Sequence, residues 1–131
     1  MLNWEKKYEI GIPKIDEQHQ HLFEIGNDIY SLLNDPMAFD KYDHITTFIT
    51  ELKDYTKYHF ASEEALMLKL KYRGYLEQKT AHDDFVAKIE AVNLNDVDKD
   101  QDKFINDLLI FVFNWILEHI LKSDMKITAE V

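Results

Sequence analysis

Apolar residues recur at intervals of three and four along much of the chain, which is the pattern of amphipathic helices. The first such stretch follows Asp16, which we expect to be the helix N-cap. It ends before Asn34-Asp35-Pro36, because proline cannot continue the hydrogen-bond ladder of a helix. This spacing predicts a first helix over 16–33. Its apolar positions are Leu22, Phe23, Ile25, Ile29, Leu32 and Leu33.

The same pattern predicts three further helices. The second runs from about Lys41 to Lys71 and the third from Tyr75 to about Val92, with Arg73-Gly74 between them, because glycine is favoured just past a helix end. The stretch from Asn93 to Asp102 is rich in Asp and Asn and is typical of a loop, and the fourth helix follows it from Asp102 to Lys122. The fourth helix is apolar around most of its circumference, so we expect it to be the most buried.

Four helices joined by short loops are typical of an all-α protein with up-down-up-down four-helix bundle topology. A chain of 131 residues has the length of one domain, and it contains only three glycines and two prolines. We therefore expect a single domain over 1–131. In it, an N-terminal arm over 1–15 precedes the helical bundle over 16–124, and a tail over 125–131 follows.

Composition and charge exclude several classes of function. The chain has no cysteine, which excludes disulfides, zinc fingers, thiolate-bound iron–sulfur clusters and cysteine nucleophiles. Its net charge of −10 disfavours nucleic acid and anionic membrane surfaces as partners. The longest apolar run, Leu108 to Leu117, is shorter than the roughly 20 residues that span a membrane, and the N-terminal residues lack the apolar core of a signal peptide. We expect a cytoplasmic protein without membrane insertion.

Two pairs of histidine and carboxylate residues have spacings that bear on metal binding. His59 and Glu63 are four residues apart, so their side chains leave the same face of a helix. His119 and Asp124 are five residues apart, which places them about 140° apart around an α-helix. The second pair can therefore converge only if the helix loosens or ends before Asp124.

Each predicted helix contributes one histidine at a depth where a bundle core could hold it. Besides the two already named, His19 lies in the first turn of the first helix and His82 lies on the third. Imidazole and carboxylate without thiolate is the donor set of non-heme iron, and carboxylate-bridged two-metal centres occur inside helix bundles. The donor types alone also allow zinc.

Each of these residues has a simpler explanation when it is taken alone. A single histidine on a helix is more often a surface residue or a hydrogen-bonded core residue than a ligand, and a histidine and a glutamate four apart commonly stabilise the helix itself. The aromatic residues Phe111, Phe113 and Trp115 fit core packing better than a ligand pocket. It is the joint pattern that supports a metal centre.

Four segments of the chain carry this joint pattern. They are Ile15-Asp16-Glu17-Gln18-His19, His59-Phe60-Ala61-Ser62-Glu63-Glu64, His82-Asp83-Asp84-Phe85 and Trp115-Ile116-Leu117-Glu118-His119-Ile120, the last followed by Asp124. In their order and separations, over nearly the whole chain, they resemble the hemerythrin family, in particular the single-domain bacteriohemerythrins. The resemblance implies a four-helix bundle around a non-heme di-iron centre that binds dioxygen reversibly.

The resemblance also implies a role for each matching residue. In the family, one iron ion takes two histidines, the other takes three, and two carboxylates bridge the ions together with an oxo or hydroxo group. The ions cycle between Fe²⁺ and Fe³⁺, and dioxygen binds at the two-histidine iron. The matching residues, in this order, are His19 and His59 for the first ion, His82 and His119 for the second, and Glu63 and Asp124 for the bridge. The matching oxygen-pocket residues are Ile116 and Ile120, with Trp115 packed behind them.

One residue departs from the family pattern. The family's third segment carries two histidines four residues apart, and Gln78 stands where the first of them is expected, four residues before His82. The amide oxygen of Gln78 can bind a metal ion, but it is a weaker neutral donor than imidazole for iron. Three explanations stay open: a natural variant that binds through its amide oxygen, a position filled by water instead, or an engineered His→Gln substitution.

No other side chain is expected to replace the missing histidine. His44 is fifteen residues from His59 and so lies about 22 Å from it along one helix, and His21 lies about 200° around the helix from His19. Both are typical of surface histidines. Glu77 would need a shifted helix to point inward.

Three functions are consistent with this pattern. The leading hypothesis is an oxygen-binding protein, not an enzyme, that stores, delivers or senses dioxygen and has an electron donor or an oxygen-consuming enzyme as partner. The second is a di-iron enzyme, such as a peroxidase or a reductase of nitric oxide or oxygen, because a weak ligand at Gln78 would open a second position on the metal. The third is a metal-free or single-metal module for partner binding. It is disfavoured, because Glu63 and Asp124 would be costly to bury unpaired.

Overall fold

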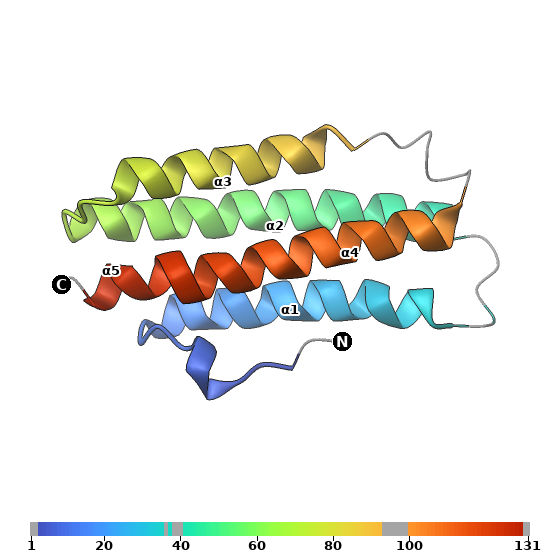
Figure 1. Ribbon diagram of the computed structural model, residues 1–131, viewed down its shortest axis with the longest axis horizontal. Coiled ribbons are helices and arrows are strands. Elements are labelled where there is room, and N and C mark those ends of the chain that lie inside the picture. Colours follow the sequence, from blue (N-terminus) through green and yellow to red (C-terminus); the bar gives the residue numbers. More distant parts are fainter. Residues whose placement is uncertain (1–2, 36, 38–40, 93–99, 130–131) are drawn as a thin grey trace.

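Four long helices packed side by side form the body of the protein (Figure 1). The computed structural model describes residues 3–35, 37, 41–92 and 100–129. Successive helices run in opposite directions; α1 packs against α2 and α4, and α2 packs against α3. The predicted all-α, up-down-up-down four-helix bundle is confirmed. The helices are α1 (Pro13–Leu33), α2 (Tyr42–Lys69), α3 (Tyr75–Glu90) and α4 (Gln101–Glu118).

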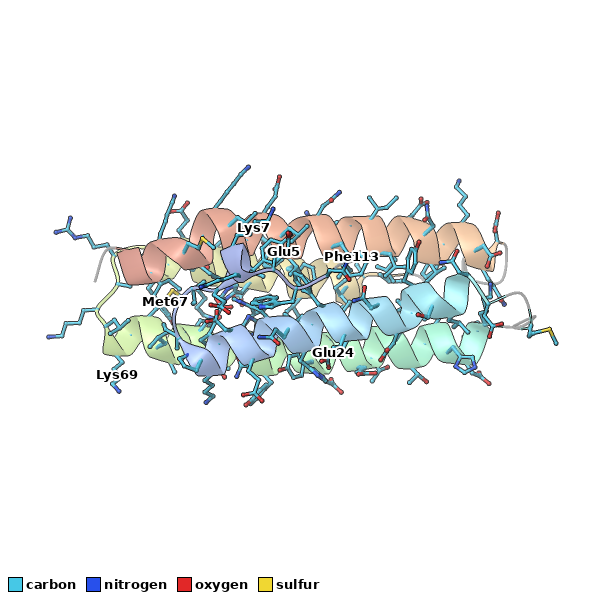
Figure 2. All side chains as sticks on the ribbon, turned by 90° about the horizontal axis from the view of Figure 1, so that it is seen from below. Glu5, Lys7, Glu24, Met67, Lys69 and Phe113 are labelled. Atoms are coloured by element: carbon cyan, nitrogen blue, oxygen red, sulfur yellow. The ribbon has the colours of Figure 1, made fainter. Side chains whose placement is uncertain are left out.

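Each helix turns its apolar face inward, as the sequence pattern predicts. On α2 the side chain of Met67 is buried between the helices, whereas Lys69, two residues later, points away from the bundle (Figure 2). The interior is filled with aliphatic and aromatic side chains from all four helices. Among them are Leu22, Phe23, Ile45, Leu52, Phe85, Ile89, Ile105 and Val112.

Helix α4 is not the most buried helix, so the expectation from its composition is wrong. Its inward face supplies Ile105 and Val112 to the core, but Ile110 on the opposite face is 53% exposed. Burial depends on what packs against a helix, and α4 buries a single face like its neighbours.

The continuous helical stretch Gln101–Ile127 has the length and the apolar composition that a membrane-spanning helix needs. The sequence analysis considered only the shorter apolar run from Leu108 to Leu117, which is too short to span a membrane. Here this stretch serves as a core helix of the bundle.

The N-terminal arm is tied to α1 by the side chain of Asp16. Helix α1 begins at Pro13, three residues earlier than predicted, because the fixed φ of proline suits the first position of a helix. Asp16 is therefore not the N-cap. Its carboxylate accepts hydrogen bonds from the backbone amides of Ile10 (2.8 Å) and Gly11 (3.2 Å). Gly11 has a φ of +93°, which glycine adopts without strain. The arm ends at Ile12, not at residue 15 as predicted.

A short 3-10 helix, η1 (Lys6–Tyr8), packs the arm against α1. The ring centroid of Trp4 lies 5.6 Å from that of Tyr8 and 5.2 Å from that of Phe23, and Tyr8 lies 5.5 Å from Phe23. These three rings form a small cluster in which Tyr8 and Phe23 are buried. The arm therefore extends the hydrophobic core on the side of α1.

The C-terminal end is helical beyond the predicted limit. Helix α4 passes directly into a π-helical turn, η3 (His119–Asp124), and then into α5 (Met125–Ala129). The fourth helix therefore does not end at Lys122, and the predicted tail over 125–131 is wrong for 125–129. Ile127 explains why the chain stays helical here, because its side chain is fully buried against the bundle.

The structure describes the connections before α4 and after α1 only in part. Helix α1 ends at Leu33, as predicted, and Pro36 lies outside the described residues. Residues 93–99 of the predicted loop also lie outside them. Asp100 caps α4 by accepting a hydrogen bond from the backbone amide of Lys103 (3.1 Å), so the helix begins one residue earlier than predicted. Helices α2 and α3 match their predicted limits within two residues.

Replacing Asp16 by alanine should lower the free energy of unfolding by about 1.5–3 kcal/mol, the typical contribution of hydrogen bonds to a charged group. Two amides of the arm lose their acceptor in this variant. Urea unfolding of the metal-free protein, followed by circular dichroism, measures the change. Glu17→Ala is the matched control, because Glu17 lies in the same helical turn but is exposed. Equal effects of the two substitutions would show that Asp16 does not hold the arm.

Candidate metal centre

Six side chains that the sequence analysis singled out converge inside the bundle, near the end that holds the turn between α2 and α3. All four helical segments contribute, and none of the six side chains is more than 7% exposed. The structure therefore brings together every predicted histidine and carboxylate ligand. His19 comes from α1, His59 and Glu63 from α2, His82 from α3, and His119 and Asp124 from η3.

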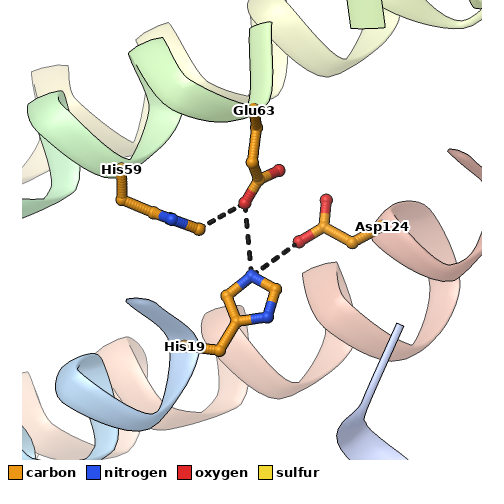
Figure 3. Close-up of side chains that lie close together, drawn as sticks. All are labelled: His19, His59, Glu63 and Asp124. Carbon is orange, nitrogen blue, oxygen red and sulfur yellow. Dashed lines mark hydrogen bonds and ion pairs between the residues drawn. The ribbon is translucent and has the colours of Figure 1, made fainter. Parts of the chain in front are cut away.

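The first group consists of His19, His59, Glu63 and Asp124, here called the His19 tetrad (Figure 3). Nε2 of His19 lies 3.2 Å from Oε1 of Glu63 and 3.1 Å from Oδ2 of Asp124. Nε2 of His59 contacts the same oxygen of Glu63. One ligand atom from each residue lies within 4.8 Å of the others, so one metal ion can contact all four.

The second group consists of Glu63, His82, His119 and Asp124, here called the His82 tetrad. Nε2 of His119 lies 3.0 Å from Oδ1 of Asp124 and 3.7 Å from Oε2 of Glu63. Nε2 of His82 lies 3.6 Å from the same oxygen of Glu63 and 2.9 Å from Nε2 of His119. These four residues also offer ligand atoms within 4.8 Å of one another.

Both carboxylates are shared between the tetrads. Glu63 turns Oε1 toward the histidines of the His19 tetrad and Oε2 toward those of the His82 tetrad. Asp124 likewise turns Oδ2 toward His19 and Oδ1 toward His119. Two carboxylates placed in this way can bridge two metal ions, each held by its own pair of histidines.

The π-helical turn explains how His119 and Asp124 point to the same place. In an α-helix, five residues advance the chain by about 500°, which would separate the two side chains by about 140°. In η3 the turn is wider, because π-helical hydrogen bonds join residues five apart, so Asp124 follows His119 by one turn. The condition stated from the sequence, a helix that loosens before Asp124, is met.

Two polar residues orient histidines from outside the tetrads. Nδ1 of His59 donates a hydrogen bond to Oε1 of Gln18 (2.7 Å), and Nδ1 of His82 donates one to Oε2 of Glu64 (2.9 Å). Each bond leaves Nε2 as the lone-pair donor that faces the tetrads. The sequence analysis missed both roles. The available signal was position, because each of these residues directly adjoins a predicted ligand in the chain.

Aromatic rings hold two of the imidazoles in place. The ring of His82 stacks on Phe60 with centroids 4.0 Å apart, and the ring of His119 stacks on Trp115 at 4.5 Å. Phe60 and Trp115 are themselves 5.6 Å apart, so they form one apolar wall. This wall limits the orientations that the two imidazoles can take.

A small cavity of about 10 Å³ adjoins the tetrads, close to the volume that one water molecule needs. The three predicted pocket residues, Trp115, Ile116 and Ile120, all line it. The sequence analysis did not find the rest of its wall, because core side chains have no pattern that distinguishes a cavity wall from ordinary packing. The remaining lining residues are His19, Leu22, Thr56, His59, Phe60, Phe85 and His119.

The carboxylates keep two histidines protonated when no metal is bound. Burial lowers the pKa of His19, but its contacts with Asp124 and Glu63 outweigh burial and raise the pKa to about 9. Burial also lowers the pKa of His119, but the same two carboxylates raise it to about 10. Burial disfavours the ionised form of Glu63, yet the charge of His59 and bonds from His119 and His19 hold its pKa well below the usual range. Protons thus supply the positive charge that the carboxylates need.

The buried oxygens of the cluster fit metal ions better than protons. Within the part of the chain that the structure describes, Oε2 of Glu63 and both carboxylate oxygens of Asp124 accept no well-directed hydrogen bond. Buried carboxylate oxygens are ordinarily hydrogen-bonded or coordinated, because an unpaired one is costly. A donor set of imidazole nitrogen and carboxylate oxygen suits iron.

Gln78 lies one helical turn before His82 on α3, so the two side chains leave the same face of the helix. Its side chain is 4% exposed, and neither polar atom of its amide has a hydrogen-bond partner among the described residues. A buried amide of this kind calls for a ligand or a water molecule as partner.

The remaining candidates lie outside the centre, as predicted. His44 and Glu77 are exposed. The side chain of His21 is 43% exposed, and its ring packs against Tyr55 with centroids 4.3 Å apart. None of these residues belongs to either tetrad.

Comparison with known proteins agrees with this architecture. The chain matches the family described as hemerythrin HHE cation binding domain over residues 10–131. It is 44% identical over 124 residues to the bacteriohemerythrin of Clostridium acetobutylicum, covering 95% of this chain and 96% of the relative. It is 30% identical over 128 residues to the hemerythrin of Themiste dyscrita, covering 98% of this chain and 92% of the relative. A crystal structure of wild-type hemerythrin matches the fold with a TM-score of 0.75 at 25% identity, covering 98% of this chain and 96% of that chain.

A helical bundle with two histidine–carboxylate tetrads defines a two-metal protein of the carboxylate-bridged class. The chain belongs to the hemerythrin family. This membership supports the non-heme di-iron centre and the dioxygen binding that the resemblance of the sequence implied. Hemerythrins bind oxygen and are not enzymes in the ordinary sense.

Metal uptake at pH 7 should release about two protons per chain, because protonated histidines must lose their protons to become ligands. The two are His19 and His119, with pKa values of about 9 and about 10. Protons compete with the metal below these values, so the apparent metal affinity should rise as the pH is raised toward them. Anaerobic calorimetric titration with Fe²⁺, in buffers of different ionisation enthalpy, counts the protons. Uptake without proton release would contradict this account of the metal-free centre.

Glu63→Ala should abolish the binding of two iron ions per chain, because it removes a ligand from both tetrads at once. Iron content after anaerobic loading and desalting is the measurement. Glu64→Ala is the matched control. It removes the neighbouring carboxylate, which only orients His82, so it should keep two ions and weaken affinity by about 10–100-fold. Two ions retained in Glu63→Ala would rule out a shared bridge.

Proposed function

We propose that this protein binds dioxygen reversibly at two iron ions, one in each tetrad, and that it stores, delivers or senses oxygen. The observation that carries the proposal is the sharing of Glu63 and Asp124 between two pairs of buried histidines. A single metal ion would leave one pair of histidines and one oxygen of each carboxylate without a partner. Two ions satisfy the whole cluster.

In this proposal, Glu63 and Asp124 hold the two ions at a fixed separation, and the four histidines complete the two sides. Iron, when bound, supplies the electrons for the reversible reduction of dioxygen. Gln18 and Glu64 keep the Nδ1 protons of His59 and His82 in place, so that both rings present Nε2 as a neutral donor.

The proposed position for dioxygen lies on the side of the His19 tetrad. The small cavity is lined by both histidines that belong to this tetrad alone, His19 and His59, whereas only one histidine of the other tetrad, His119, lines it. Apart from His119 and Thr56, its other walls, such as Phe60 and Ile116, are apolar. They exclude the water that would carry protons to the site and shorten the life of a bound oxygen molecule.

We assign Gln78 to the remaining ligand position beside His82, where its amide oxygen is a neutral donor weaker than imidazole. Three facts support the assignment: the side chain is buried, its amide has no hydrogen-bond partner in the described parts of the chain, and it shares a helix face with His82.

A second candidate function is a di-iron enzyme, such as a peroxidase or a reductase of nitric oxide or oxygen. The observation that favours it is also Gln78, because a weak ligand can give way and open a second position on the metal. An oxygen carrier needs one such position only. Sustained turnover with an added reductant is the behaviour that distinguishes the enzyme from the carrier.

The proposed partner besides dioxygen is an electron donor or an oxygen-consuming enzyme, and the proposed compartment is the cytoplasm. The net charge of −10 disfavours nucleic acid and anionic membranes as partners. The most apolar helical stretch has one face packed in the bundle core, which argues against membrane insertion.

Visible absorption of the iron-loaded protein tests the proposed function. The protein is reduced without oxygen, exposed to air and then purged with argon. A charge-transfer band that forms in air and disappears on purging is the expected result. Glu63→Ala, which removes the shared bridge, should show no such band. Irreversible oxidation in air, or continuous oxygen consumption with a reductant, would contradict the carrier and favour the enzyme.

A further inference from the structure

The amide of Gln78 is a buried polar group that the two tetrads do not use. Oε1 and Nε2 both lack a hydrogen-bond partner within the described residues, and leaving a buried donor or acceptor unpaired costs about 1–3 kcal/mol. The backbone of the residue is satisfied, because its N–H donates to the carbonyl of Gly74 at 3.0 Å. The missing partner is therefore one for the side chain.

A glutamine offers more at this position than a histidine. The ring nitrogen that faces a metal ion offers one lone pair, whereas an amide offers an acceptor oxygen and two N–H donors. If Oε1 faces the metal ion, Nε2 still needs an acceptor. A small anion on the same metal ion, next to Gln78, would be that acceptor, and histidine in its place could not donate to it in this way.

A basic hollow lies on the surface beside this part of α3, at the turn that follows α2. Its walls include three cations, Lys71, Arg73 and Lys126, and one opposing carboxylate, Glu77. Glu77 immediately precedes Gln78 in the chain, and Lys126 follows the ligand Asp124 by two residues. The hollow is therefore close in the chain to residues of the centre, and its lining includes neither Gln78 nor a residue of the His82 tetrad.

The charge of this region favours anions. The chain as a whole has a net charge of −10, but three cations surround this hollow. The hollow therefore attracts small anions. Gln78 also lies in the first turn of α3, where the helix dipole is positive. The unpaired amide offers hydrogen-bond donors to a ligand, and the basic hollow, which is an independent observation, indicates that this ligand is an anion.

We propose that Gln78 and the His82 tetrad form a second position for an exogenous ligand, which takes a small monovalent anion such as azide or nitrite. The inference rests on the proposed two-iron site. The anion displaces the weakly held amide oxygen of Gln78, accepts a hydrogen bond from its Nε2, and arrives from the side of the basic hollow. The cavity on the His19 side is the other ligand position, so each side of the centre binds its own exogenous ligand.

Azide titration of the oxidised, iron-loaded protein tests this proposal, with calorimetry for stoichiometry and visible absorption for the spectral change. The chain with Gln78 should bind two azide ions. Gln78→His should bind one, because imidazole is a firm ligand. Gln78→Glu should also bind one, because a carboxylate fills the position with negative charge. Gln20→His is the matched control, because Gln20 is exposed and the same chemical change there should leave two azide ions bound.

The hollow is tested by the rate of azide binding. Reversing two of its charges, in the double variant Arg73→Glu with Lys126→Glu, should slow association at the second position by about tenfold at low salt. The matched reversal Lys103→Glu lies at the opposite end of the bundle, where α4 begins, and should leave this rate unchanged. Equal rates in the double variant and in the chain without these substitutions would overturn the proposed role of the hollow.

The stoichiometry separates failure of this inference from failure of the proposed function. One azide ion on the chain with Gln78, or two on Gln78→His, would overturn the second position and leave the two-iron site intact. A chain with Gln78 that does not retain two iron ions would overturn the proposed function, and this inference with it.

Discussion

The burial of two carboxylates, Glu63 and Asp124, is the constraint on which the rest of the structure depends. Neither side chain has measurable exposure, and an ionised carboxylate is costly to bury without compensating charge. Histidines from four helical segments provide that compensation. His19 and His119 carry protons when no metal is bound, and all four histidines are the candidate ligands when the centre is loaded. The packing of the bundle, the π-helical turn η3 and the stacked rings of Phe60 and Trp115 all serve to bring these six side chains together.

The two sides of the centre are not equivalent, although they share the carboxylates. On one side, His59 donates to the neutral amide of Gln18, and an apolar cavity adjoins the ring. On the other side, His82 donates to the carboxylate of Glu64, and the neutral Gln78 stands one turn away. A carboxylate partner makes an imidazole a stronger donor, so Glu64 offsets part of the weakness of Gln78 as a ligand. This difference agrees with the proposals that dioxygen binds on the first side and a small anion on the second.

The four-helix bundle could be predicted from helical spacing, which a sequence carries directly, whereas the six candidate ligands were assigned through the resemblance to the hemerythrin family. The spacing of His119 and Asp124 does not suit an α-helix, and the π-helical turn resolves it. What could not be predicted depends on tertiary contacts. Asp16 binds the amides of the arm rather than its own helix, and α5 persists because Ile127 is buried. The outward face of α4 carries polar residues such as Asp107 and Asn114 beside the exposed Ile110, so the high apolar content of the helix overstated its burial.

The central claim is that two metal ions share the two buried carboxylates. Anomalous X-ray diffraction from crystals of the iron-loaded protein, collected on both sides of the iron absorption edge, tests it most directly. The account predicts two iron peaks per chain, one among the ligand atoms of each tetrad, with Glu63 and Asp124 between them. A single peak, or an iron ion outside these ligands, would contradict it.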